Sequence, residues 1–158
     1  DVPHFIERAE ALYGYRNFIA DTGGSLIEVV DHEDPDDPVV RTLTENTVLV
    51  YIRGTDRDAD ELVRRFKKNP KPMYYRPQFL IEKWNEYKAL NGIDADEDVD
   101  PAGFAAWGFA ALLHDRLPRY QALAEKFGYV IEATDLARVK SGADFLELMA
   151  LAIEGRMR

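Results

Sequence analysis

A short turn of aspartate and glycine residues could bind a nucleotide and its metal ion. It is Asp21-Thr22-Gly23-Gly24, and it follows a short apolar stretch at residues 17–20. Glycines let backbone N–H groups approach a ligand closely, and an aspartate after a parallel strand lies at the edge where α/β sheets bind ligands. Asp21 could therefore hold Mg²⁺ beside a triphosphate. The alternative is an ordinary turn in which Asp21 caps the next segment.

Basic residues gather in one third of an otherwise acidic chain. The chain has a net charge of −9, yet residues 53–76 contain Arg53, Arg57, Arg64, Arg65, Lys67, Lys68, Lys71 and Arg76. Arginine side chains suit phosphate and carboxylate groups because their N–H donors match two oxygens at once. The alternative is a solvated helix face whose charge is balanced by Asp58, Asp60 and Glu61.

A third candidate is Arg116, in Arg116-Leu117-Pro118-Arg119-Tyr120. Because Arg116 comes just before a proline kink in a helix, the backbone would hold its guanidinium in a fixed direction. The alternative is an arginine that stabilises the last carbonyl groups of a helix. Two acidic stretches, 31–37 and 94–100, are interpreted as solvated turns. The second is not expected to bind calcium, because it has Val99 where a calcium loop needs glycine.

The elements that must position these residues alternate between helix and strand. We expect strands at 17–20, 47–52 and 129–132, the second covered on both faces because it is continuously apolar. Helices are expected over 3–13, 38–46, 58–68, 77–91, 101–127 with a break or kink at Pro118, and from Ser141 onward. The apolar face of the last helix would be formed by Phe145, Leu148, Met149 and Ala152. Such alternation predicts a parallel α/β sheet, here with a piece missing at the front.

Composition limits the classes of protein. The chain has 158 residues, of which 46% are hydrophobic, so we expect one domain. It contains no cysteine, which excludes disulfides and thiolate metal sites and favours the cytoplasm. The negative charge argues against nucleic acid and membrane surfaces as partners. The longest apolar run, 104–113, is shorter than the about 20 residues needed to span a bilayer.

Taken in order, the motifs resemble the latter two thirds of a small-molecule kinase of the shikimate kinase type. They are Asp21–Ser25, Val48–Ile52, Leu62–Arg65, Lys71–Met73, Arg116–Tyr120 with Ala124, Tyr129–Ile131 and Phe145–Ile153. The resemblance implies a parallel-sheet, three-layer α/β fold like that of P-loop NTPases. It implies one domain over 1–158 with a lid-like insertion at 70–100, and a nucleotide and a small-molecule acceptor as partners.

The resemblance also implies roles for single residues. Asp21 would hold Mg²⁺ and act in catalysis, Arg64 and Arg65 would contact nucleotide phosphates with Arg64 also catalytic, and Lys71 would reach the transferring phosphoryl group. The acceptor would be bound by Gly23, Gly24 and Arg116. ATP and Mg²⁺ are thus the implied cofactors.

The phosphate-binding loop of that family is absent, because no glycine in the chain is followed by lysine. We therefore expect this chain to be the C-terminal part of a longer kinase, which requires its N-terminal remainder and is inactive without it. The missing strand would lie between the strands near Phe18 and Leu49. The predicted reaction is phosphoryl transfer from ATP to a small acceptor that could bear a carboxylate. The alternatives are a nucleotide-binding ATPase or regulator and a non-catalytic α/β interaction module.

Overall fold

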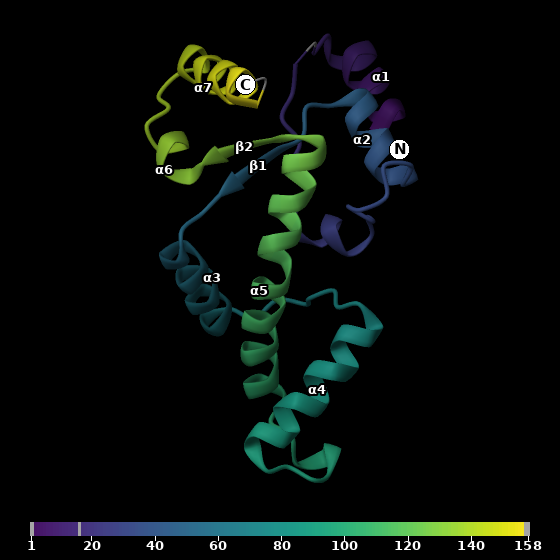
Figure 1. The fold of residues 1–158 in the computed structure, drawn as a ribbon, viewed down its shortest axis with the longest axis vertical. Coiled ribbons are helices and arrows are strands. Elements are labelled where there is room, and N and C mark those ends of the chain that lie inside the picture. Colours follow the sequence, from purple (N-terminus) through teal and green to yellow (C-terminus); the bar gives the residue numbers. More distant parts are fainter. Residues whose placement is uncertain (1, 16, 157–158) are drawn as a thin grey trace. The chain divides into compact units, whose positions relative to one another are not determined.

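The computed structural model describes residues 2–15 and 17–156, which form two compact units. The first unit holds the chain up to residue 53 together with the part from residue 119 onward, and the second holds residues 54–118. Helix α5 (Pro101–Phe127) contributes residues to both (Figure 1). The segment 70–100, expected to be a lid-like insertion, lies within the second unit.

The sheet of the first unit consists of two parallel strands. Strand β1 (Val50–Arg53) pairs with β2 (Tyr129–Glu132), in a register that sets Val50 beside Tyr129. The ladder begins one residue earlier, where the Tyr129 N–H donates to the Leu49 carbonyl at 2.9 Å. Figure 1 shows the two arrows side by side. The pairing ends with an ion pair between Arg53 and Glu132.

Helices surround this small sheet. They are α1 (Val2–Tyr13), the 3₁₀ helix η1 (Gly24–Glu28), α2 (Pro38–Asn46), α6 (Ala133–Leu136) and α7 (Gly142–Arg156). The predicted apolar face of α7 is confirmed, because Phe145, Leu148, Met149 and Ala152 are half-buried on a helix that contacts β2. The core of the unit is formed by Ile27, Val30, Val40 and Leu123.

The second unit is helical. It contains α3 (Asp56–Lys68), α4 (Pro77–Asn91), the 3₁₀ turn η2 (Asp96–Asp98) and the first part of α5. Helix α3 begins before the predicted Asp58, because the Thr55 backbone and side chain form a capping box with that aspartate. Helix α4 has its predicted bounds and ends at Gly92, which takes the left-handed conformation.

The predicted fold class is wrong. The described residues are mostly helical and contain two parallel strands in one small sheet, not the three-layer parallel sheet of a P-loop NTPase. Residues 17–20 form no strand: Phe18 packs edge-on against Phe5 with ring centres 5.4 Å apart, and Ile19 is 83% exposed. The missing strand that we placed between Phe18 and Leu49 therefore lacks one of its two neighbours.

Three further expectations, on β1 and on α5, are corrected by the structure. Strand β1 begins at Val50 rather than Thr47, because both the N–H and the hydroxyl of Thr47 bond back to the Leu43 carbonyl, at 2.8 and 2.7 Å. The strand is not covered on both faces, since Ile52 is 49% exposed. Pro118 does not break α5, which stays one helix through that position. Within the described chain, no helix combines the length and apolar character needed to cross a membrane.

Candidate anion-binding pocket

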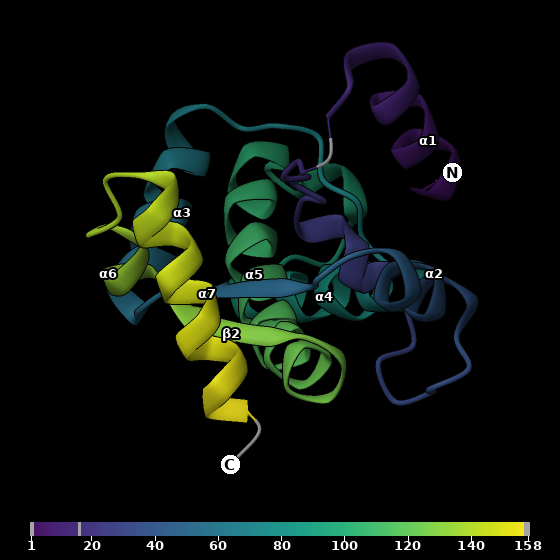
Figure 2. The same cartoon turned by 90° about the horizontal axis from the view of Figure 1, so that it is seen from above.

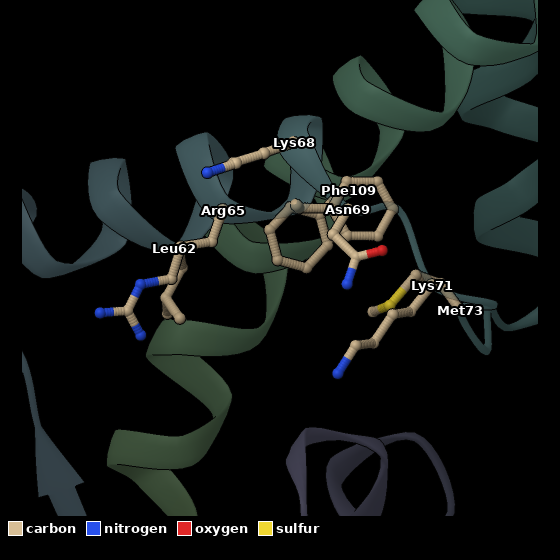
Figure 3. Close-up of a pocket in the computed structure, with 8 residues that line it drawn as sticks. Leu62, Arg65, Lys68, Asn69, Lys71, Met73 and Phe109 are labelled. Atoms are coloured by element: carbon tan, nitrogen blue, oxygen red, sulfur yellow. The ribbon is translucent and has the colours of Figure 1, made fainter.

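A pocket of about 520 Å³ lies wholly within the second unit. Three parts of the chain form it: the last turns of α3, the segment that follows α3, and one residue of α5 (Figure 3). Its lining residues are Leu62, Arg65, Phe66, Lys68, Asn69, Lys71, Met73 and Phe109. Pockets of this size hold small organic ligands.

The apolar part of the pocket is built on an aromatic pair. Phe66 is 7% exposed, and its ring lies parallel to that of Phe109, with centres 4.2 Å apart and an angle of 6° between the planes. Leu62 lies one helical turn before Phe66 and extends the same face of α3. Hydrophobic contacts and rigid aromatic surface are therefore available to the apolar portion of a ligand.

Three cationic side chains line the same pocket. They are Arg65 and Lys68 on the last turns of α3 and Lys71 just beyond it, with the amide of Asn69 between them in the chain. In Figure 3 the charged ends of these three side chains extend away from the stacked rings. No acidic residue is among the lining residues, so the pocket concentrates positive charge on a chain of net charge −9.

Glu61 occupies the guanidinium groups of two arginines, of which Arg65 lines the pocket and is thereby drawn from a ligand. Its carboxylate accepts from Arg64 at 2.6 and 2.7 Å and from the Nε of Arg65 at 2.8 Å. These hydrogen bonds, the one from Arg64 first, lower the pKa of Glu61 from 4.5 to about 2, so it is ionised at neutral pH. Arg64 bonds Glu61 through two nitrogens and does not line the pocket, whereas Arg65 does.

Arg116 does not line the pocket. It is only 5% exposed, and its Nη2 donates to the Tyr74 carbonyl at 2.9 Å. The neighbouring Asp115 accepts from Arg76 at 2.8 Å. Burial raises the pKa of Tyr75, and the charge of Arg116 partly opposes this shift. Asp115 and Arg116, both on α5, thus hold the segment that follows α3.

The Asp21 turn belongs to the first unit and has the geometry of an ordinary turn. The Asp21 carboxylate accepts from the Gly23 N–H at 2.9 Å, and the Gly24 carbonyl accepts from the Tyr120 hydroxyl at 2.7 Å. All four residues of the turn, 21–24, are exposed. Over residues 2–15 and 17–156, no three His, Asp or Glu side chains are grouped to hold a metal.

Of the predicted site residues, Arg65 and Lys71 meet in one pocket, Arg64 is turned toward Glu61, and Arg116 binds main chain. Sequence reasoning counted Lys68 among the basic residues of 53–76 but assigned it no site role. It missed Asn69 and Phe109. A signal for Lys68 was present, since it lies three residues after Arg65 and so on the same face. No local signal indicates that Phe109 lines the pocket, because it is distant in the chain from the other lining residues, 62–73.

Comparison with known proteins adds no relative: no family model, no curated protein and no solved structure matches this chain. The pocket must therefore be interpreted from its own geometry and charge.

Proposed function

We propose that this protein binds a small organic anion in the pocket of residues 62–73 and Phe109, and that the ligand carries phosphate, as a nucleotide does. The observation that carries the proposal is the joint presence of three cations and an apolar aromatic floor, without an acidic lining residue. Arginine and lysine donate charge-assisted hydrogen bonds to phosphate oxygens. An inorganic anion would use the cations alone, whereas an organic one also uses the aromatic surface.

ATP and phosphoryl transfer to a carboxylate-bearing acceptor are the finer form of this proposal. They are supported by the meeting of Arg65 and Lys71, the residues that the kinase resemblance assigns to the nucleotide and the transferring phosphoryl group. An ATPase or regulator with no acceptor is the alternative. Phosphate release that does not depend on an acceptor would favour the alternative.

The test compares matched pairs of variants by isothermal titration calorimetry with ATP and pyrophosphate, each with and without Mg²⁺. Arg65→Gln and Lys68→Gln remove pocket cations, while Arg64→Gln and Lys67→Gln remove cations from the same turns of α3 that do not line the pocket. Lys67 and Lys68 both lie in the last turn of α3, where a cation stabilises the helix end, so this pair separates ligand binding from helix stability.

We expect each pocket variant to weaken binding by about three- to tenfold, which is the loss of one charge-assisted contact. The two control variants should change affinity by less than about twofold through screened charge alone. Equal losses in pocket and control variants, or no binding by the wild-type chain, would refute the proposal.

A further inference from the structure

The wall of the pocket that carries Lys71 and Met73 has no regular secondary structure. Residues 70–75 lie between the caps of α3 and α4, Asn69 and Arg76, without helix or strand hydrogen bonding. The backbone groups of such a segment need other partners, and its position depends on the side chains that supply them. The placement of Lys71 is thus decided by neighbouring helix residues rather than by a ladder of backbone bonds.

Arg116 supplies such an anchor from α5. Its guanidinium donates to the carbonyl of Tyr74, the residue directly after Met73, at 2.9 Å. A buried guanidinium is costly unless its donors are bonded, so this side chain has a strong preference for the arrangement that satisfies it. Arg116 is 5% exposed and is not among the residues that line the pocket.

Two other contacts fix the same segment on the same helix. Arg76 donates to Asp115 at 2.8 Å, next to Arg116 in the sequence. Gly108 lets the Tyr75 hydroxyl approach α5, because a Cβ at that position would lie 3.3 Å from the hydroxyl oxygen. Three consecutive residues, Tyr74 to Arg76, are thereby held against α5.

We infer that Arg116 is a positioning residue: by holding the Tyr74 carbonyl it sets Lys71 and Met73 against the pocket, and it does not touch the ligand. This inference rests on the proposed function for its effect on affinity. It differs from the role that the kinase resemblance implies, in which the guanidinium of Arg116 itself grips the carboxylate of an acceptor. The two roles predict different coupling to Lys71.

The experiment is a pair of double-mutant cycles on the full chain, with pyrophosphate and ATP as probes. Arg116→Met keeps the length of the side chain and removes the donor, and it is combined with Lys71→Ala in one cycle and with Arg65→Gln in the other. Arg116→Lys serves as a second variant if Arg116→Met does not fold. NMR order parameters of the 73–75 backbone are measured without ligand.

We expect Arg116→Met to weaken binding by about five- to tenfold, the equivalent of one lost hydrogen bond. This loss should disappear in the Lys71→Ala background and persist in the Arg65→Gln background, and the order parameters of the 73–75 backbone should fall. Full losses in both backgrounds would overturn the inference in favour of direct contact or general destabilisation. Unchanged order parameters at 73–75 would also overturn it. If the wild type bound neither probe, the proposed function would fail, while the order parameters would still test the anchor.

Discussion

Replacing Gly128 by alanine tests the pairing on which the first unit depends. A Cβ at Gly128 would lie 2.5 Å from the Leu49 carbonyl oxygen and 3.0 Å from the Leu49 Cβ. A carbon–oxygen contact needs about 3.3 Å, so β1 would have to move by roughly 0.8 Å. The same carbonyl accepts from the Tyr129 N–H at 2.9 Å, and the movement would stretch that bond beyond a useful length.

The magnitude follows from three terms. Overpacking costs about 1–3 kcal/mol and the lost backbone hydrogen bond about 1 kcal/mol. Alanine restricts the unfolded chain and returns about 0.4–1 kcal/mol. The net expectation is a loss of about 2 kcal/mol in the free energy of unfolding, or roughly 10 °C in Tm for a unit of this size.

The assay is urea denaturation followed by circular dichroism, with Gly142→Ala as the matched control. A Cβ at Gly142 meets no atom within 4 Å, so that variant should be neutral or slightly stabilising. If Gly128→Ala were as stable as Gly142→Ala, Leu49 would not approach Gly128 as described. The parallel pairing of β1 and β2 would then be in doubt.

Further predictions concern acidic residues whose pKa values are lowered. Asp37 accepts from the N–H groups of Val39 and Val40 at 2.8 Å each, so Asp37→Ala should cost about 1 kcal/mol in urea denaturation, whereas Asp36→Ala should cost little. The Glu61 pKa falls from 4.5 to about 2, so its support of α3 is present above pH 4.5 and is lost as the pH falls toward 2. Backbone carbon shifts of α3 against pH should show this loss, and a Glu61→Gln protein should lack it. At neutral pH, Glu61→Gln should strengthen pyrophosphate binding by about two- to threefold, because Arg65 then has no competing carboxylate; weaker binding would contradict the assigned role of Glu61.

Local signals predicted several elements correctly. The start of α2 at Asp37-Pro38 and the end of α4 at Gly92 were predicted because caps and left-handed glycines act within one helical turn. The half-buried face of α7 was predicted because its apolar residues recur at helical spacing. These features depend on neighbours in the chain and can be found from a single sequence.

Partners distant in the chain decided the rest. The apolar stretch at 17–20 has strand composition, but a strand needs a neighbouring strand to pair with. In the structure the ring of Phe18 instead packs against the ring of Phe5. Arg64 and Arg65 are neighbours of the same residue type, but only Arg65 lines the pocket that α3 forms with Phe109. Arg116 was expected to face a ligand, whereas its buried guanidinium donates to the carbonyl of Tyr74. The sequence by itself determined where charge and helices occur, and the tertiary structure determined which charges meet, because burial and long-range hydrogen bonds select among side chains of the same type.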